Sequence, residues 1–350
     1  MKTFTKPTSP VARGNMRILS KALLISVMSL LLLIPIGSIE STIWDRANYR
    51  DQVINDIAKS STGSQTLAGP IIMIPYETSH IRKDKDATTG IVTETTYTRS
   101  HLSAFLPDTL DVDGTVNMEK RYRGIYLAHI YQWKGKISGQ FLLPPNFGVD
   151  SEGKPITWGK PYLALGISDT RGILYKPELT VNESTVDFEP GTLGAPVSSG
   201  LHAGLNIQAS EKQQTVSFAI DFSIQGLGDM MILPLGKTTS MKLNADWPHP
   251  SFRGNQLPLE REITDDGFTA YWQTTWFSNN LGEQFKRLGN GSNLLQELGN
   301  KTIGVRFIEA VDVYQKSERS AKYGFLFIGL TFAAFFLFEL LKQLKIHPIQ

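Results

Sequence analysis

Two apolar segments, one near each end of the chain, constrain the fold more than any other feature of the sequence. Residues 22–39 carry no charged side chain, and residues 323–341 carry one, Glu339. An α-helix rises about 1.5 Å per residue, so each segment is long enough as a helix to cross the hydrocarbon core of a bilayer. We therefore expect two membrane-spanning helices, with residues 40–322 forming a large polar domain between them.

Basic residues predict the orientation of these two spans. The N-terminal residues 1–21 contain several Lys and Arg side chains and no acidic one, and Lys342 and Lys345 follow the second span. By the positive-inside rule, residues 1–21 and 342–350 face the cytoplasm. The chain would then be a multi-pass protein of a bacterial inner (plasma) membrane, in contact with the lipid bilayer, with residues 40–322 in the periplasm.

The first apolar segment has a second interpretation, a cleaved signal peptide. It follows a basic region, as signal peptides do, but residues 37–41 match a small-x-small cleavage site poorly. An uncleaved anchor is therefore the favoured interpretation. In the second segment, Glu339 lies about one turn from the cytoplasmic end, where its carboxylate can reach the headgroups.

Composition excludes several classes of function. The chain has no cysteine, which excludes disulfides, thiolate metal sites and a cysteine nucleophile. Its 35 basic and 33 acidic residues nearly balance, and the basic residues do not cluster outside the ends, so we expect no nucleic-acid partner. Charged residues make up 19% of the chain and aromatic residues 10%, which is typical of a folded domain.

The polar domain has the sequence pattern of a mainly β protein. Apolar residues recur with helical spacing over 42–59, which predicts a juxtamembrane helix that continues the first span. Short apolar or alternating segments then predict strands at 69–76, 93–103, 123–133, 136–143, 161–168, 215–224, 239–245 and 268–276. Turn signals lie at residues 113–114, 150–153, 190–191 and 266–267. We therefore expect an antiparallel, sandwich-like domain flanked by two transmembrane helices.

Two further predictions concern the organisation of this domain. Residues 278–288 are expected to form a late helix, with Ser278 or Asn279 as its cap. The proline- and glycine-rich stretch 145–155 is the best candidate for a boundary between two subdomains.

No set of residues with catalytic or metal-binding spacing stands out. The six histidines form no ligand-spaced pair, so we expect neither a metal nor a cofactor. Ser151 and Lys154 match a Ser-x-x-Lys string, but Gly153 and Pro155 favour a turn there over the helix that such a serine needs. The glycines at 226 and 228 are not followed by the third glycine of a dinucleotide loop and are read as a turn. We therefore expect a protein that is not an enzyme.

Two segments are richer in aromatic residues than an ordinary domain needs, and they supply the candidate contact residues. Residues 246–254 place two prolines around His249, which restricts the backbone there. The segment is either a rigid loop that closes the domain or a ligand or partner contact. Residues 271–277 supply large apolar side chains for the core or for a ligand slot. The candidate contact residues are Trp247, His249, Phe252, Arg253, Trp272 and Trp276.

Several of these segments resemble one bacterial protein family. They are residues 44–53, 60–63, 67–76, 166–173, 246–258, 276–285 and 317–350, and the most distinctive is the string Trp-Pro-His-Pro-Ser-Phe at 247–252. From about residue 15 to the last residue, the chain resembles the bacterial inner-membrane protein CreD family. Members continue beyond the His-Pro-x-Gln position at 347–350 into further apolar helices, so this sequence is expected to be either a fragment or a short member.

The resemblance implies a biological setting without a mechanism. The family is linked to cell-envelope integrity under a two-component regulator, and to responses to colicins and β-lactams. It supplies no catalytic residue to carry over. The leading hypothesis is non-catalytic contact with an envelope protein or another envelope component. The alternatives are a module that binds a lipid or a cell-wall precursor and, less favoured, an envelope hydrolase.

Overall fold

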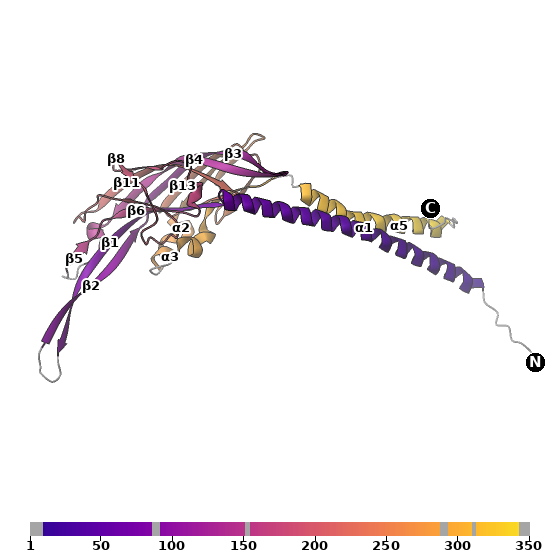
Figure 1. Cartoon of the computed structure of the whole chain (residues 1–350), viewed down its shortest axis with the longest axis horizontal. Helices are drawn as coiled ribbons and strands as arrows, with labels where there is room; N and C mark the ends of the chain where they lie inside the picture. The colour runs from indigo at the N-terminus through magenta and orange to yellow at the C-terminus, as the bar shows by residue number, and fades with distance from the viewer. Residues whose placement is uncertain (1–9, 86–91, 151–154, 288–292, 310–312, 343–350) are drawn as a thin grey trace, which may run out of the picture. The chain divides into compact units, whose positions relative to one another are not determined.

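The computed structural model describes residues 10–85, 92–150, 155–287, 293–309 and 313–342 (Figure 1). The chain divides into two compact units, residues Ile54–Ile308 and the two terminal parts of the chain. The terminal unit contains most of helix α1 (Pro10–Ser60) and helix α5 (Val313–Lys342). Among the described residues, the helices long and apolar enough to cross a membrane are Ala22–Ser60 and Lys316–Phe338.

Helix α1 contains both predicted helical segments of the N-terminal region. It runs without interruption through the apolar residues 22–39 and the predicted juxtamembrane helix 42–59, and it ends at Ser60. The two predicted terminal helices are therefore present. The side chain of Glu339 lies outside the described part of the chain.

The unit Ile54–Ile308 is a β-sandwich, and within the described residues its strands form two sheets. Sheet A has nine strands, in the spatial order β14 (Pro250–Gly254), β17 (Ile303–Phe307), β12 (Asp229–Leu233), β1 (Gln65–Lys85), β6 (Tyr162–Ile167), β10 (Gly200–Gly204) and β9 (Glu189–Pro190), with β2 (Val92–Phe105) and β5 (Ile156–Trp158) also paired to β1. Sheet B has eight, in the order β15 (Glu260–Ile263), β16 (Phe268–Thr275), β13 (Thr238–Ala245), β3 (Thr109–Arg123), β4 (Tyr126–Leu143), β11 (Gln214–Leu227), β7 (Glu178–Val181) and β8 (Ser184–Asp187).

Most strand pairs are antiparallel, as predicted, and two are parallel: β1 with β12, and β3 with β13. Short helices complete the unit. They are α2 (Trp276–Asn279), α3 (Leu281–Arg287), α4 (Leu294–Leu298) and three single 3₁₀ turns at Pro145–Gly148, Thr170–Gly172 and Gly299–Lys301.

Sheet A is buried on both faces. Side chains alternate along its central strands, so one set packs against sheet B and the other set packs under α3 and α4. On β6, Leu163, Leu165 and Ile167 enter the core shared with sheet B, which includes Trp133 and Phe141. The alternate residues of β1 and β6 join a second cluster, which α3 and α4 cover; its members include Ile71, Met73, Ala164, Leu281, Leu294 and Leu298. Sheet B therefore has one face in the core and one face of exposed polar residues.

Two strand predictions are corrected by the structure. The strands predicted at 123–133 and 136–143 are not separate, because residues 126–143 form the single strand β4, while Arg123 ends β3. The turn signal Asp113-Gly114 lies inside β3. Gly114 pairs with Gly135 across these strands, and a Cβ on Gly114 would lie 2.3 Å from the Trp133 indole nitrogen. These glycines make room for a buried tryptophan, so here they do not mark turns.

The predicted late helix is divided in two. Asn280 adopts a left-handed conformation at φ 51 and separates α2 from α3. The Asn279 side chain accepts a hydrogen bond from the backbone N–H of Leu281, which confirms it as a cap.

Leu288 lies outside the described residues, as do residues 151–154 within the predicted turn at 150–153. The subdomain boundary near 145–155 stays a prediction; the main core cluster draws residues from both sides of it.

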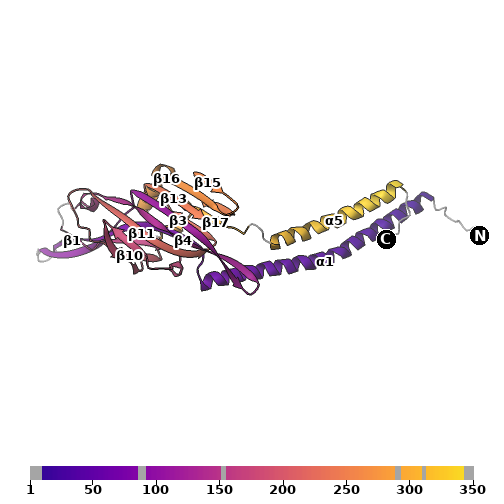
Figure 2. The same cartoon turned by 90° about the horizontal axis from the view of Figure 1, so that it is seen from above.

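Two hairpins extend beyond the neighbouring strands of the sandwich (Figures 1 and 2). Within the described residues, β1 pairs beyond Thr78 only with β2, and most of β2 is exposed. The predicted strand 93–103 is therefore confirmed, and it forms an arm. Within the described residues, 117–129 of β3 and β4 likewise pair only with one another, because Ala245 at the end of β13 pairs with Val116 and Leu227 at the end of β11 pairs with Ile130.

Candidate functional site

The segment that follows α1 is fixed to the sandwich by one buried amide, that of Gln65. The Gln65 side chain Nε2 donates to Thr62 Oγ1 at 2.8 Å, to Asp169 O at 2.9 Å and to Gln225 O at 3.1 Å. Its Oε1 accepts from the hydroxyl of Ser168 at 3.1 Å. Gln65 is 1% exposed, so these partners replace water. We call residues 61–65 the N-terminal junction.

An ion pair sits at the end of helix α1. Asp169 and Arg171 form a two-point pair, with Nε–Oδ1 and Nη2–Oδ2 distances of 2.9 and 2.6 Å. Arg171 Nη1 also donates to the carbonyl of Lys59, at the helix end where carbonyls lack helical partners. The hydrogen bonds from Arg171 hold the pKa of Asp169 below its ordinary value.

The tryptophan–proline–histidine loop contacts the point where the chain leaves the sandwich, at Ile308. Trp247 Nε1 donates to the carbonyls of His249 and Ile308, both at 3.1 Å. The indole packs at 4.8 Å, centroid to centroid, from the ring of His129. The indole of Trp247 thus ties this loop to Ile308, the last residue of the sandwich. We call residues 306–308 the C-terminal junction.

The turn between β11 and β12 is bonded to both junctions. Leu227 N–H donates to Gly63 O, and Phe307 N–H donates to Gly228 O, each at 3.0 Å. Asp229 accepts two hydrogen bonds from Arg306, both at 2.6 Å, and its backbone N–H donates to Ser64 Oγ at 3.2 Å. We call residues 227–229 the junction clamp, because they tie the two places where the sandwich connects to the terminal helices.

The clamp corrects one sequence interpretation. Gly226 lies inside β11, and only Gly228, at φ +88, is in the turn.

The phenol of Tyr131 donates to Asp229 O at 2.7 Å, and burial raises the pKa of this phenol well above its ordinary value. The hydrogen bonds of Arg306 with Asp229 raise the pKa of its guanidinium.

The candidate contact residues fall in different environments. Phe252 and Trp272 lie together, 5.6 Å apart between ring centroids, and Trp272 is 1% exposed in the core. His249 and Arg253 are exposed on the same segment as Trp247. They are accessible to a partner, whereas Trp272 is not.

Trp276 is separate from that group. It lies 5.3 Å from the Lys237 ammonium and against Gly282, while the neighbouring Phe277 is fully exposed. Trp272, Trp276 and Phe277 thus do not share one environment, and the apolar slot expected from these three side chains receives no support.

The exposed face of sheet B carries a feature that the sequence analysis missed. Eight residues, one from each strand, stand in register across the sheet: Asp187, Glu178, Asp221, Lys136, Asp113, Lys242, Tyr271 and Glu260. We call this set the charged row. These residues are far apart in the sequence, and strand pairing alone brings them together. The only sequence signal for them is alternation along each strand, which indicates that they share a face but not which residues become neighbours.

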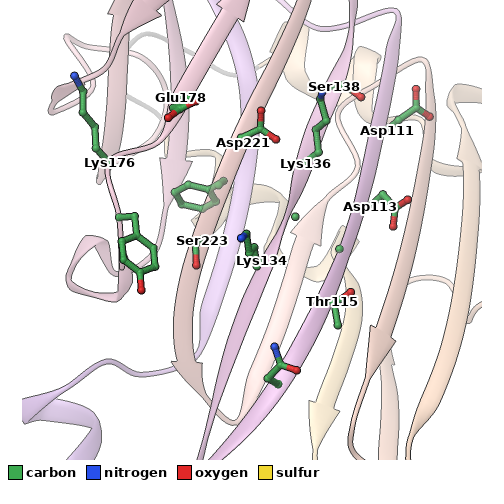
Figure 3. A pocket seen from close by; sticks show the side chains of 15 residues that line it. Asp111, Asp113, Thr115, Lys134, Lys136, Ser138, Lys176, Glu178, Asp221 and Ser223 are labelled. Carbon is green, nitrogen blue, oxygen red and sulfur yellow. The ribbon is translucent and has the colours of Figure 1, made fainter.

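A groove of about 1020 Å³ runs over this face (Figure 3). Lys134 and Lys136 lie in it between Asp221 on one side and Asp111 and Asp113 on the other. Within the described residues, neither lysine has a hydrogen-bond or ion-pair partner. The groove therefore offers cationic and anionic groups side by side to a polar ligand.

The described residues offer no arrangement suited to metal chemistry. No group of three or more His, Cys, Asp or Glu side chains among them is placed to hold a metal ion. The groove has instead what reversible binding needs, namely exposed charges on rigid strands.

Comparison with known proteins decides the family. A family model described as "Inner membrane protein CreD" matches residues 17–350. The chain belongs to this family. The CreD protein of Escherichia coli (strain K12) is 36% identical over 321 residues, which cover 92% of this chain and 68% of that protein. The chain is therefore an inner membrane protein, of a family that is not known as an enzyme family.

Similarity to solved structures adds nothing to this assignment. Two crystal structures of an M1 zinc metallopeptidase from Deinococcus radiodurans, one of them a mutant bound to a Tyr-Ser-Ala substrate, match 48% of this chain at 9% identity, with TM-scores of 0.24 and 0.26. The match covers only 38–39% of those chains. Scores this low carry no functional argument.

Three of the segments that resemble the CreD family lie at the two junctions. Residues 60–63 and 166–173 build the N-terminal junction, and residues 246–258 hold the C-terminal junction.

Proposed function

We propose that this CreD-family protein supports cell-envelope integrity by non-catalytic binding of a polar envelope component to the exposed face of sheet B. In this proposal both termini are cytoplasmic and residues 40–322 are periplasmic. The observation that carries it is the groove in which Lys134 and Lys136 lie among carboxylates without a protein partner in the described residues.

The chemistry of the groove favours one class of ligand. Its exposed lysines suit carboxylates or phosphates, and Asp113 and Asp221 suit amines. Cell-wall peptides and their precursors carry both kinds of group on a polar, extended chain. A cell-wall precursor is therefore a better match than an apolar lipid tail, which needs an apolar cavity.

The test is binding of a soluble disaccharide–peptide fragment of peptidoglycan to the full chain in lipid nanodiscs. Lys134→Gln with Lys136→Gln is expected to weaken binding at least about tenfold, equivalent to about 1.4 kcal/mol. Lys212→Gln is the matched control, because Lys212 is an exposed lysine on a loop away from the groove. Equal affinity of the double variant and the wild type would refute the assignment of the site.

The tryptophan–proline–histidine loop stays a second candidate contact. His249 and Arg253 are both exposed, and the loop backbone is held by Trp247 and Ile308. A partner protein that binds there would sit at the C-terminal junction.

A further inference from the structure

A cleft opens in the sandwich where strands β6 and β10 separate. Their pairing ends with Tyr162 opposite Gly204, followed by a hydrogen bond from Leu205 N–H to Pro161 O at 2.8 Å. Residues 158–161 and 205–209, together with Phe147, line the cleft, which has a volume of about 700 Å³. We call it the Trp158 cleft. None of its lining residues lines the groove on sheet B, so the cleft and the groove are separate.

The ring of Trp158 is held in place at this cleft by two aromatic neighbours. Strand β5 sets it opposite Tyr76 of β1, at 5.6 Å between ring centroids, and Phe147 lies at 5.1 Å with its ring nearly perpendicular, at 84°. Phe147 is 3% exposed and belongs to the main core, whereas Trp158 is partly exposed. The indole is thus supported from the core and still reaches solvent in the cleft.

The backbone that carries Phe147 is strained. Asn146 and Phe147 both adopt left-handed conformations, at φ 47 and φ 52, which are uncommon for residues other than glycine and cost energy. The Asn146 N–H donates to Ser210 O at 2.7 Å, which ties this turn to the residue that follows Ala209 of the cleft. Surrounding contacts thus maintain an unfavourable backbone conformation where it brings Phe147 against Trp158.

Polar groups line the same cleft. Lys160 is exposed, and a Cβ on Gly204 would lie 3.0 Å from its Nζ, so the lysine side chain lies along the end of β10. Within the described residues, no acidic side chain pairs with Lys160. Asn206 and Gln208 add exposed side-chain amides, and the Gln208 carbonyl accepts a hydrogen bond from Gln214 Nε2 at 2.8 Å. The cleft therefore combines an aromatic surface, two amides and one cation.

This combination suits a sugar ring with one carboxylate. A pyranose has an apolar face of C–H groups that packs on an aromatic ring, and hydroxyl groups at its rim that donate and accept hydrogen bonds, as side-chain amides do. A single lysine balances the one negative charge of a carboxylate, whereas a phosphate monoester carries nearly two. A lipid tail needs an apolar cavity, and this cleft is bordered by polar groups.

We propose that the Trp158 cleft binds one carboxylated sugar ring of an acidic glycan. The sugar ring stacks on Trp158, the amides of Asn206 and Gln208 bind its hydroxyl or acetamido groups, and Lys160 binds its carboxylate. The site does not depend on the function proposed for the groove of sheet B, because the two share no residue and this ligand needs no peptide.

The test uses the full chain in lipid nanodiscs and two peptide-free disaccharides, followed by ligand-observed NMR titration. N-acetylglucosaminyl-N-acetylmuramic acid carries a carboxylate, and N,N′-diacetylchitobiose does not. The acidic disaccharide should bind about tenfold more tightly, because it gains a charge-assisted hydrogen bond to Lys160. Lys160→Gln should remove this difference, and Trp158→Leu should weaken both ligands about fivefold. Lys120→Gln is the matched control, because Lys120 is an exposed lysine of β3 that does not line the cleft.

A double variant separates this site from the groove. Lys134→Gln with Lys136→Gln should leave the affinity for the acidic disaccharide unchanged, and loss of binding in that variant would overturn the proposal. Equal affinity of the wild type for the two disaccharides, or binding of neither, would also overturn it. So would displacement of the disaccharide by an equal concentration of octanoate, because the cleft would then take a lipid chain. If Trp158→Leu does not fold, Lys160→Gln decides alone, because Lys160 is exposed.

Discussion

Replacing Gln65 by leucine should loosen the N-terminal junction more than any other single change there. Gln65 is 1% exposed, and its amide supplies donors to Thr62, Asp169 and Gln225. Leucine fills similar space but offers no hydrogen bond. A buried polar group left without its partner costs about 1–3 kcal/mol, so leaving two such groups unpaired lowers the free energy of unfolding by about 2–6 kcal/mol.

That loss is a large part of the typical free energy of unfolding of a native protein, about 5–15 kcal/mol, so it is easy to measure. Five of the six tryptophans lie in the sandwich, and their fluorescence during denaturation of the full chain in detergent reports its unfolding. Gln273→Leu is the control, because Gln273 is an exposed glutamine of β16 and its loss should change stability by less than about 0.5 kcal/mol. If Gln65→Leu were as stable as this control, the amide would not hold the junction.

Three other predictions follow from the same structure. Gly114→Ala should destabilise the sandwich by about 1–3 kcal/mol in the same assay, because its Cβ would overlap the buried indole of β4, whereas Gly299→Ala, with open space around it, should be nearly neutral. Asp169→Asn should be less stable than wild type above pH 3.8, because it loses the ionised carboxylate that Arg171 stabilises. The difference in the free energy of unfolding should shrink as the pH falls through the lowered pKa of the folded carboxyl, and a constant difference over an acid titration would contradict this. Replacing His249 and Arg253 together by Ala should leave stability within about 0.5 kcal/mol but abolish complementation of an envelope-defective strain; full complementation at normal protein levels would exclude this contact.

The parts of the fold that the sequence predicts correctly are those with local signals. The two apolar terminal helices need only length and absence of charge, and the helix end at Ser60 follows from the change to small polar residues. The buried strand 69–76 is recognisable because nearly all of it is apolar, as expected when both faces are covered.

The incorrect strand and turn predictions between residues 113 and 136 share one physical cause, which is that a glycine acts through its neighbours in space. Gly114 and Gly135 look like turn formers, yet they stand opposite each other in the middle of two long strands, where the indole of Trp133 takes the space of a side chain. Nothing local distinguishes such a glycine from one in a turn. The strand predicted at 93–103 is confirmed as β2, but its alternation does not show that most of it is exposed, because alternation predicts a strand and not what covers it.

The charged row shows the same limit for function. Lys136 and Asp113 are 23 positions apart, and Asp221 is 85 positions beyond Lys136, yet strand pairing sets them side by side. Their spacing in the sequence carries no chemical pattern, whereas the tryptophan–proline–histidine string is compact and draws attention. In the structure that compact string mainly closes a junction, through the indole of Trp247. A motif that is dense in the sequence can thus be structural, while binding groups on a sheet are dispersed among strands, which is why the face of sheet B is the better place to search for a ligand.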